Sequence, residues 1–358
     1  MRTITVELGK RSYPVHIGEG TLSMLGDSLK PEKGTVALLT VPPVKTLYCG
    51  MAENILSKSG IDAKIIEVPD GEQAKSIGVF SDVVEKLAGF GAGKDSVIVS
   101  LGGGCVGDLA GFVAATYMRG TQLVHVPTTL LAQVDAGIGG KTAINHPKAK
   151  NLIGAIYQPK FVLEDTALLA TLPARELGCG TAELIKYGAM LDCNLLGTLE
   201  KDFSGLLSLE PSLLERVVSR AVSLKAGIVA RDELDQGVRM LLNFGHTVGH
   251  AIESLTSYRV SHGEAVALGM AAEARMSKRM GMLNSSEVER LDSVIASYGL
   301  PARSKDGLRP ESVAGMMERD KKARAGKVRL ALPRRLGEGT VVTAPSLDIM
   351  LSCIAEVI

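Results

Sequence analysis

Three of the six histidines in this 358-residue chain lie close together and could hold a metal ion. His246 and His250 are four residues apart, so on a helix both imidazoles project from one face, as zinc ligands often do. His262 opens the next predicted helix after a short loop and could turn back towards His246. The segment is not the metalloprotease motif, because Thr247 stands where that motif has its catalytic glutamate. A single histidine here would be read as a hydrogen-bonded structural residue, whereas three together favour a metal or catalytic role.

A carboxylate is a suitable third ligand for such a site. Glu183 lies in a strongly apolar helical stretch, and Asn243, Glu253 and Glu264 lie beside the histidines in the sequence. The alternative for Glu183 is a charge near a helix N-terminus that complements the helix dipole. A zinc ion with three protein ligands and one open position would be a Lewis acid able to polarise a hydroxyl or carbonyl group.

A glycine-rich turn at residues 102–108 could bind phosphate. The apolar run at 96–101 predicts a strand, and Gly102, Gly104 and Gly107 follow it with the spacing G-x-G-x-x-G before a predicted helix. Glycines there let the backbone approach a pyrophosphate at a helix N-terminus. The ribose-binding acid expected about twenty residues later is missing, so the turn indicates a nucleotide-binding α/β domain that departs from the ordinary Rossmann fingerprint. The alternative is a tight turn without a ligand.

The segment 127–151 combines glycines with the lysines Lys141, Lys148 and Lys150. Glycines expose backbone N–H groups, and lysines act as point charges for phosphate or carboxylate. Lys141 directly follows two glycines, so no neighbouring side chain shields it. The alternative is an ordinary solvated loop. Further basic groups, each of which alone would be read as solvated surface, are Lys225, Arg239, Lys321 and Lys322.

The elements that must position these groups change character along the chain. Short apolar runs alternate with helical stretches in the first half, which predicts an α/β domain with a mainly parallel, Rossmann-like sheet. The predicted strands are 3–8 and 13–17 as a hairpin, then 35–40, 63–68, 96–101 and 122–126, and the predicted helices are 74–88 and 108–118.

Helical periodicity dominates after about residue 165 and predicts an all-helical second domain with a possible late strand at 327–332. The predicted helices are 174–191, 211–231, 240–257, 263–282, 286–298 and 310–320. The predicted domains are therefore residues 1–165, which would bind the nucleotide, and 166–358, which would bind metal and substrate. The junction at 163–172 is short, so we expect packed domains with the active site in the cleft between them.

Composition narrows the class of partner. The 40 basic and 39 acidic residues give a net charge of +1, whereas a nucleic-acid binder would show a basic excess. A small anionic substrate needs only a local group of positive charges. We see no apolar run of membrane-spanning length and no export signal. The five scattered cysteines suit a reducing cytoplasm.

Several long segments closely resemble the 3-dehydroquinate synthase family of the sugar phosphate cyclases, in the family's order and spacing from about residue 65 to 330. The resemblance is carried by Asp70–Lys75, Gly102–Gly120, Pro127–Asp135, Gly139–Pro147, Leu241–Glu253 and His262–Ala267. It implies a two-domain homodimer with NAD on the α/β domain and zinc, or cobalt, on the helical domain. It also implies that the metal ligands are Glu183, His246 and His262, which leaves His250 to face the substrate.

The same resemblance implies the other site residues. NAD contacts would come from Asp70, Gly71, Glu72 and Lys75, from Gly102, Gly103, Gly104, Cys105, Val106, Gly107 and Asp108, from Thr128, Thr129, Lys141 and Lys150, and from Leu168, Leu169 and Thr171. Substrate contacts would come from Asp135, Lys141, Lys150, Asn151, Lys225, Arg239, Asn243, His250 and Lys321. Arg119 resembles the arginine that reaches the partner subunit's phosphate site.

The implied reaction converts 3-deoxy-D-arabino-heptulosonate 7-phosphate into 3-dehydroquinate and phosphate, a step of the shikimate pathway. It passes through transient oxidation at C5, loss of phosphate, re-reduction, ring opening and an intramolecular aldol step. No net oxidation occurs, so bound NAD would be recycled. His250 would assist proton transfer.

Some positions depart from the family pattern. Val41-Pro42-Pro43 replaces the acid or amide that often contacts the adenosine end of NAD, which leaves open how the adenosine ribose is held. Ala136-Gly137-Ile138 and Asp235 are milder changes. Three alternatives are a cyclase of secondary metabolism, a metal-dependent polyol dehydrogenase and a non-catalytic NAD-binding regulator. The synthase is favoured over the cyclase of secondary metabolism by two intact segments, Lys141-Thr-Ala-Ile-Asn-His-Pro and the pair Lys150-Asn151.

Overall fold

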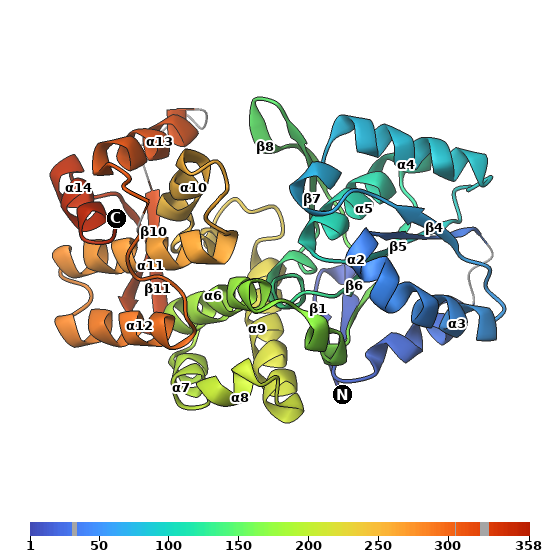
Figure 1. Cartoon of the computed structure of the whole chain (residues 1–358), viewed down its shortest axis with the longest axis horizontal. Coiled ribbons are helices and arrows are strands. Elements are labelled where there is room, and N and C mark those ends of the chain that lie inside the picture. The colour runs from blue at the N-terminus through green and yellow to red at the C-terminus, as the bar shows by residue number, and fades with distance from the viewer. Residues whose placement is uncertain (31–33, 305, 323–328) are drawn as a thin grey trace. The chain divides into compact units, whose positions relative to one another are not determined.

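The computed structural model describes residues 1–30, 34–304, 306–322 and 329–358. The chain divides into two compact units, each made of more than one stretch of sequence (Figure 1). Unit 1 comprises Met1–Leu172 and Pro211–Leu234, and unit 2 comprises Pro173–Glu210 and Asp235–Ile358. The predicted division after residue 165 stays a prediction; these units also assign helix α9 (Pro211–Arg231) to unit 1.

Unit 1 is built on a seven-stranded sheet in the order β1-β2-β9-β6-β5-β3-β4. The first two strands pair antiparallel as the predicted hairpin, and every other neighbouring pair is parallel. The mainly parallel sheet is therefore confirmed. Its strands are β1 (Arg2–Val6), β2 (Tyr13–Ile17), β3 (Val36–Thr40), β4 (Lys64–Glu67), β5 (Val97–Gly102), β6 (Gln122–Pro127) and β9 (Phe161–Glu164).

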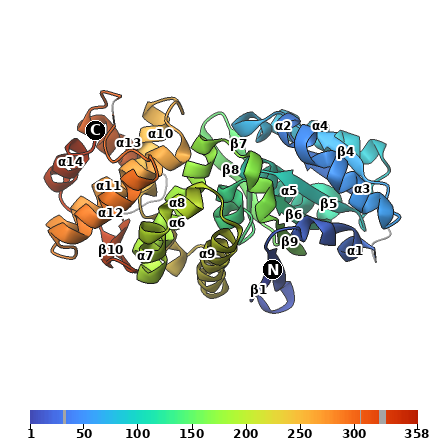
Figure 2. The ribbon, with the colours of Figure 1, turned by 60° about the horizontal axis from the view of Figure 1, so that its bottom comes forward.

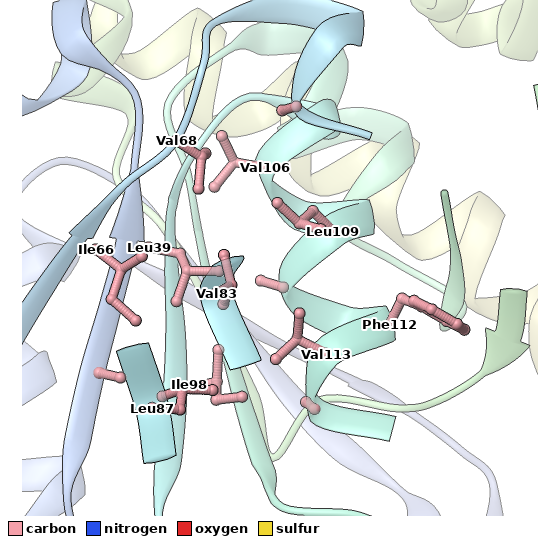
Figure 3. Close-up of a cluster of buried hydrophobic side chains, with 14 of the residues drawn as sticks. Leu39, Ile66, Val68, Val83, Leu87, Ile98, Val106, Leu109, Phe112 and Val113 are labelled. Atoms are coloured by element: carbon pink, nitrogen blue, oxygen red, sulfur yellow. The ribbon is translucent and has the colours of Figure 1, made fainter. Parts of the chain in front are cut away.

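Helices cover both faces of this sheet. On β3 and β5, alternate residues enter two different apolar clusters, because successive side chains of a strand point to opposite faces. Helices α4 (Ile77–Gly89) and α5 (Gly104–Thr116) cover one face, where Val83, Leu87 and Leu109 pack against Leu39 and Ile98 (Figure 3). Helices α1 (Leu25–Leu29) and α3 (Gly50–Lys58) cover the other face; the short helix α2 is Pro42–Val44. Burial of both faces explains why the strands read as continuous apolar runs.

The lysine-bearing segment after β6 forms a separate hairpin of β7 (Lys141–His146) and β8 (Ala149–Ile156). Residues 141–156 are therefore a hairpin and not a loop, and whether the lysines of this segment bind an anion stays a prediction. Strand β7 lies against α5, and Gly111 permits the contact, because a Cβ there would overlap the side chain of Thr142. The hairpin was not predicted as strands because most of β8 is exposed and its residues do not alternate between polar and apolar.

Unit 2 is mainly helical, as predicted, but it also contains a β-hairpin and so is not all-helical. Helix α11 runs through its middle with α6, α10, α12 and α14 against it (Figures 1 and 2). Its elements are α6 (Ala174–Leu191), α7 (Cys193–Lys201), α8 (Phe203–Leu207), α10 (His246–Leu255), α11 (His262–Arg279), α12 (Ser285–Ser297), α13 (Pro310–Lys322), β10 (Arg329–Arg335), β11 (Glu338–Thr343) and α14 (Leu347–Ala355). The late strand predicted at 327–332 corresponds to β10; residues 327 and 328 lie outside the described part.

In the portion of the chain that the structure describes, no helix is both long enough and apolar enough to cross a membrane.

Candidate active site

Glycines bring α10 and α11 unusually close. A Cβ on Gly249 would lie 2.9 Å from the carbonyl oxygen of Ala265, and one on Gly269 would overlap the carbonyl oxygen of Gly245. The two helices therefore touch backbone to backbone and run in opposite directions, because Gly245 lies against Gly269 while Gly249 lies against Ala265. His246 is the first residue of α10 and His262 the first of α11, and their ring centroids lie 5.3 Å apart.

A third glycine sets α11 against α6. A Cβ on Gly263 would overlap the Cα of Cys179, so the first turn of α11 lies on the α6 backbone. Glu183 is one helical turn beyond Cys179 on the same helix. This contact brings Glu183 beside His262, which follows Ser261 at the start of α11.

The turn before α10 is fixed by a buried carboxylate. Gly245 has a φ of 78°, a left-handed conformation that favours glycine. Glu273 of α11 is fully buried and accepts hydrogen bonds from the backbone N–H of Gly245 (2.7 Å) and of Val248 (3.2 Å). It thus satisfies N–H groups that a helix N-terminus leaves without partners. The position of His246 follows from this cap.

Glu183, His246 and His262 offer three metal-ligand atoms within 4.8 Å of one another. Oε1 of Glu183 lies 3.4 Å from Nε2 of His246 and 3.5 Å from Nε2 of His262. Nδ1 of His246 lies 3.1 Å from the carbonyl oxygen of Phe244, which can only accept, so Nδ1 carries the proton and Nε2 keeps its lone pair. That lone pair and a carboxylate oxygen would repel at this distance unless a cation lies between them. The donor set therefore fits a zinc-like ion.

The two imidazoles of the trio differ in their ionisation. Burial, helped by the nearby charge of Lys186, lowers the pKa of His246 to about 3. Burial disfavours the charged ring of His262 as well, but the carboxylates of Glu183 and Glu253 outweigh it and raise its pKa to about 10. Without a metal, the protonated ring of His262 lies between the carboxylates of Glu183 and Glu253. A divalent ion would replace the proton on Nε2, the ring nitrogen that faces Glu183.

His250 belongs to a second, overlapping group. Its Nε2 lies 4.0 Å from Oε2 of Glu253, and the other oxygen of Glu253 lies 3.5 Å from Nδ1 of His262. His250, Glu253 and His262 therefore also meet the distance criterion for a metal site. Within the described residues, no such group contains both His246 and His250, so the i, i+4 spacing alone does not define the site. Which group holds the ion stays a prediction.

Lys186 is a charged residue of this site that the sequence analysis did not assign. Its side chain is 2% exposed, forms an ion pair with Glu183 three residues earlier on α6, and lies 5.1 Å above the ring of Tyr187. Fully buried lysines are rare unless paired, so a lysine inside a strongly apolar helical stretch was the available signal. Glu264, in contrast, accepts from the backbone N–H of Ser261 in a capping box and pairs with Arg175. Its carboxylate serves the start of α11.

The glycine turn of unit 1 leads directly from β5 into α5, as predicted. A Cβ on Gly103 would lie 3.2 Å from the side chain of Thr129, and one on Gly104 would lie 3.0 Å from Ala136. The backbone N–H of Thr128 donates to Gly102 (3.0 Å). No side chain caps the N-terminus of α5, which suits a pyrophosphate at that position.

Lys75 links three segments of unit 1 around this turn. Its side chain is 4% exposed, donates to Asp108 of α5 (2.6 Å) and to the side chain of Asn151 in β8, and lies 3.7 Å from Glu72. Burial opposes its charge, but Asp108 and Glu72 outweigh that effect and raise the pKa of Lys75. Burial raises the pKa of Asp108, although Lys75 counteracts it. The structure thus brings together four residues predicted at the NAD or substrate site.

Glu72 extends the same network to the hairpin. It accepts a hydrogen bond from the side chain of Asn145 (2.7 Å), lies 3.8 Å from Nζ of Lys150, and accepts from the thiol of Cys105 (3.6 Å). Burial works against ionisation of Glu72, but Lys75 and Asn145 prevail and lower its pKa. Burial raises the pKa of Cys105 to about 12, so its thiol stays protonated. Asp70 caps the turn at Gly71–Ala74, which holds Glu72 in place.

The remaining predicted residues are distributed over both units. Lys225 of α9 donates to the backbone carbonyl of Asp135 (2.6 Å) and forms an ion pair with its carboxylate. Lys141 is exposed at the start of β7, and Arg239 is 3% exposed in a short 3₁₀ turn that ends at Asn243. Leu168 accepts through its carbonyl from the hydroxyl of Tyr48, which also contacts Thr171, while the Leu169 side chain is fully buried.

Two predicted residues stand apart. Arg119 is exposed in a left-handed conformation (φ of 62°), and the Nζ of Lys94 binds the carbonyl oxygens of Met118, Arg119 and Gly120. The arginine side chain is therefore presented on the surface by a fixed loop. Lys321 belongs to α13, but its side chain lies outside the described residues.

Family comparisons agree with this geometry. The model of the 3-dehydroquinate synthase N-terminal region matches residues 65–179, and that of its C-terminal region matches residues 180–323. The chain belongs to the 3-dehydroquinate synthase family. It is 45% identical over 344 residues to a 3-dehydroquinate synthase of Pelotomaculum thermopropionicum, covering 95% of this chain and 93% of that protein. It is also 45% identical to a 3-dehydroquinate synthase of Desulforamulus reducens, covering 94% and 95% of the two chains.

Solved structures of related cyclases share the fold of this 3-dehydroquinate synthase family member. A 2-deoxy-scyllo-inosose synthase complexed with carbaglucose-6-phosphate, NAD+ and Co2+ has a TM-score of 0.91 at 25% identity over the whole of both chains. A 2-epi-5-epi-valiolone synthase from Streptomyces hygroscopicus with NAD+ and Zn2+ bound has a TM-score of 0.90 at 27% identity over 98% of each chain. An iron-containing alcohol dehydrogenase from Thermococcus thioreducens, at 17% identity and a TM-score of 0.68, shares the fold alone.

Proposed function

We propose that this protein is a 3-dehydroquinate synthase of the shikimate pathway, which converts 3-deoxy-D-arabino-heptulosonate 7-phosphate into 3-dehydroquinate and phosphate. The observation that carries the proposal is the convergence of two imidazole Nε2 atoms on one buried carboxylate oxygen, that of Glu183. Identity of 45% to proteins of that name over most of the chain supports the same reaction.

Glu183, His246 and His262 would hold the metal ion, zinc or cobalt, in this proposal. NAD would lie at the N-terminus of α5, with the Lys75, Asp108 and Glu72 network beside it. When bound, NAD supplies reversible hydride acceptance at C5 and the metal supplies Lewis-acid polarisation of the C5 oxygen. Lys75 and Asp108 neutralise each other, so the loop near the phosphates gains no net negative charge from them.

The chain's own residues would bind and orient the substrate and move its protons. Lys141, Lys150, Arg239 and Lys225 supply positive charge for phosphate and carboxylate groups. The ion pair with Asp135 fixes the ammonium of Lys225, which reduces the entropy lost on binding. His250 is exposed on α10 and would accept or donate a proton at its ring nitrogens. The prediction that the active site lies in an interdomain cleft stays a prediction.

The assembly and location of the protein belong to the same proposal. A homodimer would place Arg119, presented on its fixed loop, at the partner's phosphate site. Gel filtration with light scattering would test the dimer, and Arg119→Ala would weaken phosphate binding without changing the oligomer. A cytoplasmic location is the expected one for this pathway.

Release of inorganic phosphate from the heptulosonate tests the function directly. We expect release by protein that contains NAD and zinc, loss of release after both are stripped, and recovery when both are restored. Activity that survives complete removal of both would contradict the mechanism. Glucose 6-phosphate serves as the competing substrate, because a glucose 6-phosphate analogue is bound in the related 2-deoxy-scyllo-inosose synthase. Phosphate release from it alone would assign the protein to secondary metabolism instead.

A second assay separates the synthase from a polyol dehydrogenase. Glycerol and NAD are added, and the absorbance of NADH is followed. A dehydrogenase accumulates NADH, whereas the synthase returns its hydride equivalent in each turnover and accumulates none at steady state.

A further inference from the structure

Glu253 lies between two of the three histidines of the candidate site. Its side chain is 10% exposed, and each of its carboxylate oxygens faces a different imidazole. Oε1 is 3.5 Å from Nδ1 of His262, and Oε2 is 4.0 Å from Nε2 of His250. The metal group of Glu183, His246 and His262 does not use this second buried carboxylate.

The His262 ring needs a partner of this kind. Its Nε2 faces Oε1 of Glu183, so that nitrogen must keep a lone pair if it is to bind the ion. The ring proton then sits on Nδ1, where Oε1 of Glu253 is placed to accept it. A carboxylate in this position fixes the tautomer and orientation of a metal-bound histidine and makes it a stronger ligand.

The other oxygen of Glu253 serves an exposed ring. The His250 side chain is 57% exposed, so packing alone constrains its rotation weakly. Glu253 lies three residues later on α10, on the same side of the helix. Attraction to a carboxylate held by His262 therefore limits the orientations that His250 can adopt.

We propose that Glu253 is a positioning residue that serves both histidines: it fixes His262 as a metal ligand through one oxygen and orients His250 for proton transfer through the other. This inference rests on the proposed metal site and on the proposed role of His250. It predicts two separable losses when the carboxylate is removed, one in metal affinity and one in turnover.

Metal affinity tests the first part of the proposal, that Glu253 fixes His262 as a metal ligand. Wild type, Glu253→Gln and Glu183→Gln are compared by zinc competition with a chromogenic chelator and by the visible absorption spectrum after cobalt loading. Glu289→Gln is the matched control, because it is an exposed glutamate of α12 with the same loss of charge. We expect zinc to bind about 10- to 100-fold more weakly to Glu253→Gln, with an altered cobalt spectrum, and no change in the control. Wild-type affinity and spectrum in Glu253→Gln would overturn the proposal.

The same measurements separate this inference from the proposed metal site. If wild type binds no zinc, or Glu183→Gln binds it as tightly as wild type, the proposed site itself is wrong. If His250→Ala loses zinc as fully as Glu183→Gln, the ion lies in the group of His250, Glu253 and His262. Glu253 would then be a ligand, and its positioning role would be excluded.

Turnover at saturating zinc tests the second part of the proposal, that Glu253 orients His250 for proton transfer. Glu253→Gln is made in wild type and in His250→Ala, which gives a double-mutant cycle. We expect kcat to fall about tenfold in the wild-type background with little change in KM, and to change less than about twofold when His250 is already absent. An equal loss in both backgrounds would overturn this half. Should the glutamine variant fold poorly, Glu253→Asp keeps the charge but retracts both oxygens, and it should show the same two losses in weaker form.

Discussion

The carboxylate of Glu273 accepts a hydrogen bond from the backbone N–H of Gly245 at 2.7 Å. This bond joins the middle of α11 to the turn that precedes the proposed metal ligand His246. A hydrogen bond to a buried charged group contributes roughly 1.5–3 kcal/mol to stability.

Glu273→Gln should therefore destabilise unit 2 by about 2 kcal/mol and weaken zinc binding, because the amide keeps one acceptor but loses the charge that favours the N-terminus of α10. Thermal unfolding with and without zinc measures both effects. The matched change Glu289→Gln removes a charge at an exposed position and should leave both unchanged. A melting temperature equal to that of wild type would show that the cap is not needed.

The glycine contact between α10 and α11 gives a second prediction. In Gly269→Ala the new methyl group overlaps the carbonyl oxygen of Gly245, so the helices must separate. We expect a loss of about 1–3 kcal/mol, the usual cost of overpacking, together with weaker zinc binding. Gly315→Ala is the control: it lies in α13 with no atom near its Cβ position, and should slightly stabilise the protein. Equal stability of the two variants would contradict the close packing.

The exposed histidine of α10 gives a third prediction. His250→Ala should lower kcat by about 100-fold or more, the usual range for a general acid or base, while zinc content stays near that of wild type. Metal analysis of the purified variant decides the outcome. Loss of zinc would instead place the ion in the group of His250, Glu253 and His262.

Acid sensitivity of unit 1 gives a fourth prediction. His125 is buried in β6 beside the hydroxyl of Ser100 (2.6 Å), and burial lowers its pKa to about 4. An unfolded histidine titrates near 6.5, so the unfolded state takes up a proton at a higher pH than the folded state does. The stability from this residue is full above pH 6.5 and is lost as the pH falls towards 4, at about 1.4 kcal/mol per pH unit.

Urea denaturation at several pH values checks this effect. Between pH 6.5 and 4.5 the wild-type midpoint should fall more steeply than that of His125→Gln, whatever the absolute stability of the variant. Parallel curves would show that His125 does not couple folding to protonation.

Local sequence patterns predicted most of the sheet and of the helices, because strands buried on both faces and amphipathic helices carry their signals in neighbouring residues. Strand β9 was missed since it has only four residues and ends on the charged Glu164. The assignment of α9 to unit 1 was not foreseen either. The apolar face of a helix shows that it packs, but not against which partner, and α9 contacts β1.

The proposed metal ligands of the candidate site could be named from the sequence, but the residues that support them could not. Spacing placed His246 and His250 on one face of a helix and made Glu183 and His262 candidates, and the resemblance to a family selected Glu183, His246 and His262 as the ligands. The supporting carboxylates Glu253 and Glu273 could not be assigned a role, because that role depends on contacts between helices. Lys186 was overlooked although a lysine in an apolar helical stretch was a signal of burial; that its ammonium pairs with Glu183 is shown only by the structure.

The inserted position of α9 has a consequence for synthesis of the chain. Unit 1 is not a continuous stretch of sequence. The last strand of its sheet along the chain is β9, but helix α9, which contacts β1, follows only after the segment 173–210. Domains generally fold as units while the ribosome is still extending the chain. Here the α/β unit would have to wait until residue 234 has emerged, with the first helices of the other unit already made. A protein cut at residue 172 would lack a structural helix, so the two halves cannot be expressed separately as intact units.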